Sequence, residues 1–205
     1  MLGTKILEER KSKFNGRIQV IRSLGFGTYI QVEGLTQSGG IVTDVWKTTL
    51  KKLRTKEIKN CLILGLGGGS AAKLVRKYWP NCKITGVEID PVMVELGKKY
   101  LGLGQIGMEI EICDAFTYPL SAVRCDLVVV DLYVGDEFPK KFESERFSSL
   151  VHGLLTDSGV AVFNRLYYGE KRKEAVKFGN KLEKIFKKVD WFYPQANLML
   201  LCYNK

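Results

Sequence analysis

The sequence predicts an α/β fold in which a mostly parallel sheet carries helices on both faces. From residue 60 onward, short aliphatic runs alternate with stretches of helical periodicity, which is the pattern of parallel strands joined by crossover helices. The first aliphatic run leads directly into a glycine-rich turn at residues 65–69, as expected where a buried strand connects to a helix. Before residue 60 the pattern differs, because apolar residues there alternate with polar ones.

Length and composition agree with one folded domain that carries a small appendage. The chain has 205 residues, of which 45% are hydrophobic and 26% are charged, close to globular averages. The first residues are charged and do not resemble a cleavable leader, and no apolar run reaches the roughly 20 residues of a membrane span. We therefore expect a cytoplasmic protein without membrane contact.

Charge and cysteine content narrow the expected partners. The formal net charge is +10, but the basic residues are dispersed and are not interleaved with aromatic residues, so we expect a lysine-rich surface and no nucleic-acid partner. The five cysteines form no C-x-x-C pair, and His152 is the single histidine of the chain. This composition predicts buried thiols and no metal site.

Residues 1–42 are expected to form a small N-terminal β-hairpin region. Apolar side chains alternate with polar ones between residues 16 and 34, and Leu-Gly-Phe-Gly at 24–27 predicts the turn. Residues 43–59 have a basic helical pattern whose inner face would contain Val45, Leu50 and Leu53. We place the start of the α/β domain, residues 43–205, at this helix.

Seven strands are expected in the α/β domain. The parallel strands would cover residues 61–64, 83–88, 109–113, 127–130 and 160–164, separated by helices at 70–79, 91–100, within 142–154, and at 171–187. Two final strands at 189–193 and 198–203 are separated by a Pro-Gln-Ala-Asn turn. This ending resembles the antiparallel strand pair that closes the sheet of class I methyltransferase folds.

Polar residues at three successive strand ends predict a site for an adenine nucleoside. Gly65, Gly67, Gly68 and Gly69 would let the backbone approach the ligand closely, and the N-terminus of the following helix would offer it unpaired N–H groups. Glu88 ends the next strand about 20 residues later, where a carboxylate accepts hydrogen bonds from both ribose hydroxyls.

Asp114 follows the third strand and can accept a hydrogen bond from the adenine amino group. Because parallel strands bring their carboxyl ends to one edge of the sheet, these groups converge on one crevice. The residues after the two carboxylates, Ile89 and Ala115, belong to the same predicted site.

Five segments carry a family signature: L-I-L-G-L-G-G-G at 62–69, V-E-I-D-P at 87–91, C-D-A at 113–115, D-L-V-V-V-D at 126–131 and L-T-D-S-G-V at 155–160. In this order they resemble spermidine synthase and its relatives, the polyamine aminopropyltransferases. The resemblance implies a Rossmann-like class I methyltransferase fold and either S-adenosylmethionine or decarboxylated S-adenosylmethionine as the cosubstrate. It places Gln37 near the nucleoside and Asp131 at the position of the catalytic aspartate. It also implies a possible homodimer.

The sequence departs from aminopropyltransferases at three positions of this resemblance. Gly68 replaces the aspartate of their G-G-G-D-G-G loop, and Val134 replaces the second aspartate of their D-S-S-D-P segment. Their Y-H-E element appears as Trp46-Lys-Thr48, which puts Lys47 in the expected acceptor region. A polycationic acceptor needs carboxylates to offset its lost hydration. The departures therefore favour another acceptor.

Four functions follow from these residues. The leading hypothesis is methyl transfer from S-adenosylmethionine to an unidentified acceptor, with Asp131 and Tyr133 as the candidate catalytic residues. The alternative is aminopropyl transfer to a diamine, for which Asp136, Glu137 and Glu143 would have to supply the missing carboxylates. A third is a non-catalytic nucleoside-binding or scaffold protein. A nicotinamide-dependent dehydrogenase ranks last because no hydride-transfer base stands out.

Overall fold

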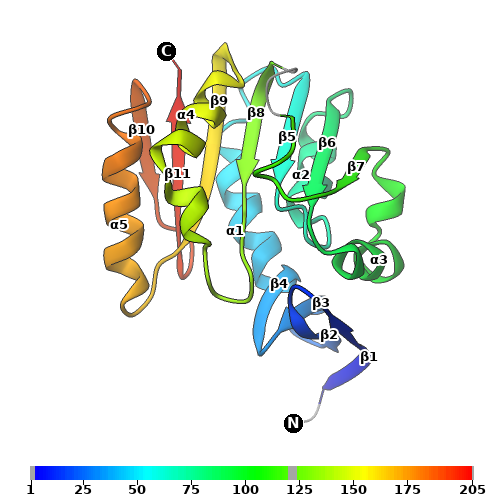
Figure 1. The fold of residues 1–205 in the computed structure, drawn as a ribbon. Coiled ribbons are helices and arrows are strands. Elements are labelled where there is room, and N and C mark those ends of the chain that lie inside the picture. The colour runs from blue at the N-terminus through cyan, green and yellow to red at the C-terminus, as the bar shows by residue number, and fades with distance from the viewer. Residues whose placement is uncertain (1–2, 120–123, 205) are drawn as a thin grey trace.

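The computed structural model describes residues 3–119 and 124–204, which form two sheets connected by one helix (Figure 1). The first sheet is antiparallel, in the order β1-β2-β3-β4, and the second has seven strands in the order β10-β11-β9-β8-β5-β6-β7. Helix α1, Gly40–Lys51, follows the first sheet directly and leads into the second. The site described below lies where the two sheets approach each other.

The N-terminal region is a four-stranded sheet, which is larger than the predicted hairpin. The hairpin corresponds to β2, Gly16–Ser23, and β3, Gly27–Val32, and its turn lies where the sequence predicts it. The flanking strands β1, Thr4–Ser12, and β4, Leu35–Gly39, were missed. Strand β1 is an edge strand with mostly exposed side chains, so its sequence lacks the apolar alternation of a half-buried strand.

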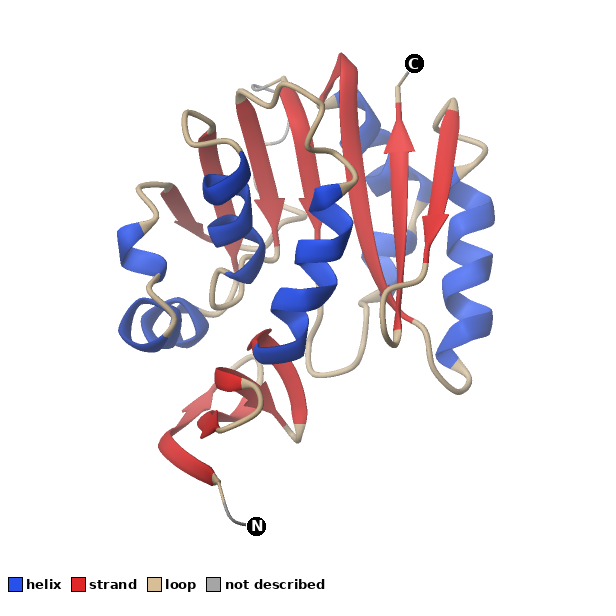
Figure 2. Ribbon diagram, turned by 180° about the vertical axis from the view of Figure 1, so that it is seen from behind, coloured by secondary structure: helices blue, strands red, loops and turns tan. Residues whose placement is uncertain are grey.

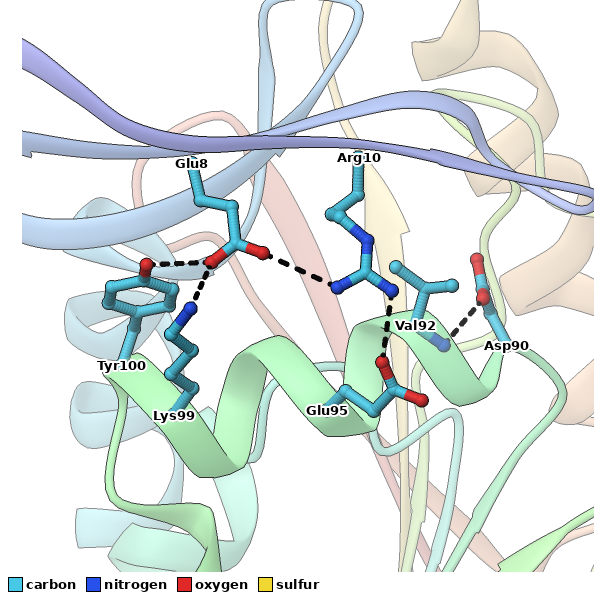
Figure 3. Close-up of polar contacts among 7 residues, drawn as sticks. All are labelled: Glu8, Arg10, Asp90, Val92, Glu95, Lys99 and Tyr100. Atoms are coloured by element: carbon cyan, nitrogen blue, oxygen red, sulfur yellow. Dashed lines mark hydrogen bonds and ion pairs between the residues drawn. The ribbon is translucent and has the colours of Figure 1, made fainter.

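The N-terminal sheet is anchored to helix α3, Pro91–Tyr100. Apolar side chains of β2 and β3 form one buried cluster with two residues of α3, and its buried members are Ile18, Val20, Ile30, Val32, Met93 and Leu96. Polar contacts add to this packing (Figure 3). Glu8 of β1 accepts hydrogen bonds from Lys99 Nζ at 2.6 Å and from Tyr100 Oη at 2.7 Å.

These contacts set the charge state of Glu8. The hydrogen bond from the Lys99 ammonium, followed by that from Tyr100, lowers the pKa of Glu8 to about 2. Arg10, on the same strand, contacts both Glu8 and Glu95 of α3 (Figure 3). The N-terminal sheet is therefore held to α3 by ion pairs along its edge and by apolar packing beneath.

The large sheet has the predicted strands and directions. Its strands are β5 Asn60–Leu64, β6 Lys83–Glu88, β7 Glu109–Ile112, β8 Cys125–Val130, β9 Leu155–Leu166, β10 Lys188–Phe192 and β11 Asn197–Tyr203. Strands β5 to β9 pair in parallel, whereas β11 is antiparallel to both β9 and β10. This confirms the mostly parallel seven-stranded sheet and its closing antiparallel pair.

Helices cover both faces of this sheet. Helices α1 and α2, Ser70–Tyr78, lie on one face, whereas α4, Glu145–Gly153, and α5, Lys171–Leu182, lie on the other (Figures 1 and 2). Neighbouring residues of one strand alternate between the two cores. In β5, Cys61 and Ile63 pack toward α1 and α2, and Leu62 and Leu64 pack toward α4 and α5.

Several element boundaries differ from the predictions. The helix predicted at 43–59 begins at Gly40 and ends at Lys51, after which Lys52 N–H bonds to Thr49 O and the chain continues in tighter turns. Helix α5 ends at Leu182, earlier than predicted, and β9 extends beyond both predicted ends. The proposed domain boundary after residue 42 falls inside α1 and stays a prediction.

Within residues 3–119 and 124–204, no helix combines the length and the hydropathy needed to span a bilayer. Cys61, Cys82, Cys125 and Cys202 are buried, whereas Cys113 is half-buried beside the pocket described next. Burial raises the pKa of each of these thiols.

Candidate functional site

A pocket lies at the carboxyl ends of the parallel strands and faces the N-terminal sheet. It holds about 890 Å³ of space between the atoms, part of which is open to solvent. The predicted site residues that line it are Gln37, Gly65, Gly67, Glu88, Ile89, Asp114, Ala115, Asp131 and Tyr133. We call this space the nucleoside pocket, after the ligand that the sequence predicts for it. The carboxyl ends of the parallel strands bring together Gly65, Glu88, Asp114 and Asp131, and Gln37, which the resemblance placed here, reaches the pocket from the N-terminal sheet.

The glycine turn after β5 passes against the backbone that follows β8. Gly65 has a φ of +87°, and a Cβ there would lie 2.1 Å from the carbonyl oxygen of Asp131. Any side chain at this position would push apart the two strand ends that form the floor of the pocket. Glycine at position 65 is thus required by the close approach of β5 and β8.

The N–H groups of the glycine turn, residues 65–69, are all paired, whereas the expectation of unpaired N–H groups at the start of α2 stays a prediction. The N–H groups of Gly65 and Leu66 donate to Val87 O, and that of Gly69 donates to Leu66 O. Those of Gly67 and Gly68 donate to side chains, Glu88 Oε2 at 2.7 Å and Ser38 Oγ at 2.7 Å. The turn is closed by its own protein contacts, so its role is to shape the wall of the pocket.

Glu88 is the buried carboxylate of the pocket, with 8% of its surface exposed. Its Oε2 accepts from Gly67 N–H and its Oε1 accepts from Asp90 N–H at 2.9 Å. Burial raises the pKa of Glu88, although both backbone N–H groups oppose the shift. Each carboxylate oxygen keeps a second acceptor position, so Glu88 can bind a pair of vicinal hydroxyls while it holds the glycine turn.

Asp114 lies at the far end of the pocket, after β7, and is paired with Lys141. Its Oδ1 accepts from Phe116 N–H at 2.9 Å, and its Oδ2 forms an ion pair with the Lys141 ammonium. Partial burial acts to raise the pKa of Asp114, but the Lys141 contact and the Phe116 N–H outweigh it, and the pKa is lowered. Asp114 is therefore an anionic hydrogen-bond acceptor at neutral pH.

Asp131 follows β8 and lies at the centre of the site. Its Oδ2 accepts from the indole Nε1 of Trp46 at 2.9 Å, and its Oδ1 accepts from Nδ2 of Asn164 at 2.7 Å. Asn164 is oriented in turn by Asn197, whose Nδ2 donates to Asn164 Oδ1 at 2.8 Å. Burial raises the pKa of Asp131, with the two donors opposing the shift. A fixed carboxylate with a raised pKa suits a proton acceptor.

Tyr133 has a different environment from the one its predicted catalytic role requires. Its hydroxyl accepts from Leu166 N–H at 2.7 Å and donates to Asn164 O at 3.3 Å. Burial is the main cause that raises the pKa of the Tyr133 hydroxyl. Both contacts are to the backbone of β9, so the hydroxyl is occupied in holding the β8 end against β9. The geometry favours a positioning role for Tyr133.

A second cavity adjoins the nucleoside pocket and shares Gln37, Val42, Asp131 and Tyr133 with it. It holds about 880 Å³ of space, part of it open to solvent. Its walls come from β4, α1, the end of β9 and the turn before β11. We call this cavity the second chamber. Asp131 thus lies at the junction of two spaces, which is the arrangement that transfer between two bound molecules requires.

Two of the predicted glycines lie outside this site. Gly68 and Gly69 do not line the nucleoside pocket; they line a separate hollow beside α2 that also contains Lys47. Gly68 is buried against Ser38 and Ile30 of the N-terminal sheet. The expectation that Lys47 faces the acceptor is also wrong, because Trp46 points to Asp131 and the next residue of the helix faces elsewhere.

The acidic residues of the β8–α4 loop are paired with basic residues away from the site. Lys171 forms ion pairs with Asp136 at 3.0 Å and with Glu137 at 3.2 Å, and Arg165 forms one with Glu143 at 2.7 Å. None of these three carboxylates lines the nucleoside pocket or the second chamber. They anchor the loop, together with Gln37, whose Nε2 donates to Gly135 O at 2.8 Å.

The sequence reasoning assigned neither Asn164 nor Lys141 to the site, and it noted Trp46 only as part of the segment that replaces the Y-H-E element. Asn164 lies in the carboxyl-terminal part of β9, which is parallel to β8, so the strand-end rule would have found it. Trp46 lies within a helix and has the pattern of a core residue. Lys141 lies in a short 3₁₀ helix, Lys140–Glu143, of a loop with no periodic signal. Among the residues that the structure describes, no group of three or more His, Cys, Asp or Glu side chains could hold a metal ion.

Comparison with curated proteins finds two kinds of relative. The chain is 28% identical over 153 residues to the "eEF1A lysine and N-terminal methyltransferase" of Mus musculus, which covers 69% of this chain and 22% of that protein. It is 27% identical over 194 residues to the "Polyamine aminopropyltransferase" of Clostridioides difficile, which covers 89% of this chain and 68% of that protein. The chain spans less than a quarter of the length of the mouse relative.

Solved structures show the same fold. Spermidine synthase from Thermotoga maritima superposes with a TM-score of 0.79 at 17% identity, covering 98% of this chain and 73% of that one. Human methyltransferase-like protein 13, solved in complex with SAH, superposes with a TM-score of 0.64 at 23% identity, covering 80% of each chain. These neighbours confirm the Rossmann-like methyltransferase fold. Residues 48–196, more than half of the chain, match the family model described as "Spermine/spermidine synthase domain", and the chain therefore belongs to this family.

Proposed function

We propose that this protein is a transferase that binds S-adenosylmethionine and transfers its methyl group to an acceptor in the second chamber. One observation carries the proposal: the two cavities meet at Asp131, and Asp131 is the one carboxylate that they share. The other two carboxylates of the nucleoside pocket, Glu88 and Asp114, lie at separate strand ends, as the ribose and the adenine of one nucleoside require.

The residues present fit such a nucleoside. Glu88 offers two carboxylate oxygens for the ribose hydroxyls, and Asp114 offers an anionic acceptor for the adenine amino group. S-adenosylmethionine supplies an activated methyl group on a sulfonium sulfur. The protein then has to align the acceptor, keep water away and remove a proton where the acceptor carries one. Asp131, oriented by Trp46 and Asn164, is the group that can hold that proton.

Packing at Gly68 argues against aminopropyl transfer. Aminopropyltransferases resemble this chain around the glycine turn but carry an aspartate at the equivalent position, next to the aminopropyl end of their cosubstrate. Here a Cβ at position 68 would lie 2.9 Å from side-chain atoms of Ile30, Leu101 and Ser38, so a larger residue would have to displace these side chains. The methyltransferase relatives in mouse and human support the same choice.

Aminopropyl transfer from decarboxylated S-adenosylmethionine to a diamine is the second candidate. The Clostridioides difficile relative, which is aligned over most of this chain, favours it. It would require the aminopropyl ammonium and the acceptor to rely on Asp131 alone, since Asp136, Glu137 and Glu143 are paired elsewhere. A protein that binds the nucleoside without catalysis is the third candidate.

Calorimetric titration separates the two transferase functions, and an assay for S-adenosylhomocysteine formation separates methyl transfer from binding without catalysis. Purified protein is titrated with S-adenosylmethionine, its decarboxylated form, methylthioadenosine and NAD. We expect the tightest binding for S-adenosylmethionine. A preference for the decarboxylated compound, together with turnover of putrescine, would replace methyl transfer by aminopropyl transfer. Absence of binding to any adenosyl sulfur compound at high micromolar concentration would refute both transferase functions.

A further inference from the structure

The second chamber has mostly apolar walls. Val42 and Val45 of α1 face Leu166 at the end of β9, and Leu35 of β4 adds to the same lining. At its mouth, Ile41 and Tyr168 remain 40% and 37% exposed, so apolar surface continues from the chamber to the outside. An acceptor that fills this chamber therefore buries apolar surface along its length.

The chamber carries a single charge. Among the described residues that line it, Asp131 is the one ionisable acid, and no lysine or arginine accompanies it. The remaining polar side chains, including Thr36, Asn164 and Asn197, are neutral. One carboxylate can compensate one ammonium group, and a second ammonium in the apolar part would be buried without a partner.

The acidic residues of the β8–α4 loop already have basic partners and are not available to pair with a second ammonium group. Asp136 and Glu137 share the Lys171 ammonium, and Glu143 is held by the buried Arg165 guanidinium. Turning Glu143 toward the chamber would take its carboxylate from the buried Arg165, and turning Asp136 or Glu137 would break one of the two ion pairs of Lys171. The chamber therefore suits an acceptor that has one amine and an otherwise apolar body.

We propose that the acceptor is a monoamine, that is, a molecule or side chain that presents one primary amine on an apolar stem and carries no second ammonium within the chamber. This inference rests on the proposed methyl transfer and adds the class of acceptor. A free alkylamine and the side chain of a lysine in a polypeptide share this chemistry. The exposed apolar mouth at Ile41 and Tyr168 accommodates the remainder of a larger acceptor.

The transfer step balances with Asp131 as the proton acceptor. The amine arrives as an ammonium ion and gives one proton to the Asp131 carboxylate, which becomes a neutral acid. The nitrogen lone pair then forms a bond to the methyl carbon of S-adenosylmethionine while the carbon–sulfur bond breaks. The electron pair of that bond stays on sulfur, which becomes a neutral thioether, and the methylated nitrogen carries the positive charge. Asp131 returns its proton to water.

Matched pairs of amines test the proposal. Hexylamine and hexane-1,6-diamine have the same stem and differ in the second ammonium, as do butylamine and putrescine. Formation of S-adenosylhomocysteine is followed by chromatography with each compound and with a peptide that contains one lysine. We expect kcat/KM to be at least about tenfold higher for each monoamine than for its diamine, because the second ammonium loses hydration without a partner. Turnover of the peptide or of the free amines identifies which source of the amine the protein uses.

A charge added at the mouth should change this preference. In the Ile41→Glu variant we expect the ratio of diamine to monoamine kcat/KM to rise about two- to fivefold, as for a partly exposed ion pair. Leu150→Glu is the matched control, because Leu150 is 41% exposed on α4 and lines neither cavity. It should leave the ratio unchanged.

The outcomes distinguish this inference from the proposed function. Equal or better turnover of the diamines by the wild-type protein overturns the monoamine class while methyl transfer stands. Binding of S-adenosylmethionine without methylation of any amine in the panel also overturns it. Absence of S-adenosylmethionine binding overturns the proposed function and the inference with it.

Discussion

Replacing Gly68 by alanine or aspartate tests how the glycine turn is packed. A Cβ at this position would lie 2.9 Å from Ile30 Cδ1, Leu101 Cδ1 and Ser38 Cβ, which is closer than carbon atoms approach without displacement. Ile30 is fully buried, so it has little freedom to move away. Overpacking of this kind costs about 1–3 kcal/mol, and we expect Gly68→Ala to lower the free energy of unfolding by that amount.

The aspartate variant adds an electrostatic cost. Its carboxylate would have to be accommodated beyond the same crowded Cβ, and taking a charge partly out of water costs further free energy, so we expect a larger loss than for alanine. Urea unfolding followed by tryptophan fluorescence measures both variants. Gly153→Ala is the control, since a Cβ at that helical position meets no atom within 4 Å and alanine favours a helix. A Gly68→Asp protein with wild-type stability that binds decarboxylated S-adenosylmethionine more tightly than S-adenosylmethionine would refute the reasoning.

Four further substitutions test the site and its support. Glu88→Gln should raise the Kd for S-adenosylhomocysteine about 10- to 150-fold, because hydrogen bonds to a charged group contribute about 1.5–3 kcal/mol; an unchanged Kd would show that Glu88 does not hold the nucleoside. Asp131→Asn should lower kcat/KM about 10²- to 10⁴-fold with nucleoside affinity retained. Burial raises the pKa of Asp131, so the wild-type rate should fall as the pH drops through that raised pKa and the carboxylate gains a proton. The Asp131→Asn variant should lack this fall in rate at acidic pH. If both proteins show the same fall, Asp131 is not the proton acceptor. Tyr133→Phe should cost about 1–3 kcal/mol of stability by leaving a backbone N–H unpaired, with the shape of the pH–rate profile unchanged. Glu8→Gln should lower the urea midpoint of unfolding above pH 4.5. Because the pKa of Glu8 is lowered to about 2, the difference in midpoint between variant and wild type should disappear as the pH falls from 4.5 toward 2. A constant difference over that range would contradict the assigned ion pair.

Periodicity predicted most of the large domain because its strands are buried on both faces. A strand such as β8, with Val128, Val129 and Val130 fully buried, is an unbroken aliphatic run whatever its neighbours are. The same reasoning failed for β1, whose exposed charged residues serve contacts with α3 that only exist once the chain is folded. The helix predicted at 43–59 ends later than α1 because the basic helical pattern of the sequence continues past Lys51, whereas the α-helical hydrogen bonds end there.

The site was predictable where it depends on strand ends. Glu88, Asp114 and Asp131 each follow a strand of the parallel sheet, so chain order alone places them at one edge. The donors that orient Asp131 come from elsewhere: Trp46 from a helix before the sheet and Asn164 from the neighbouring strand. Their pairing with one carboxylate has no signature in the local sequence.

The glycine turn shows which features the local sequence decides and which the tertiary structure decides. The sequence by itself determined that the chain turns sharply after β5, and it predicted a nucleoside site at this edge, because glycine spacing and strand-end carboxylates are local properties. Only the tertiary structure decided which way each glycine faces. Gly65 and Gly67 line the pocket, whereas Gly68 is packed beneath the N-terminal sheet, since the position of that sheet depends on contacts with α3 that are distant in sequence. The tertiary structure likewise decided that, of the described residues lining the second chamber, Asp131 is the one carboxylate.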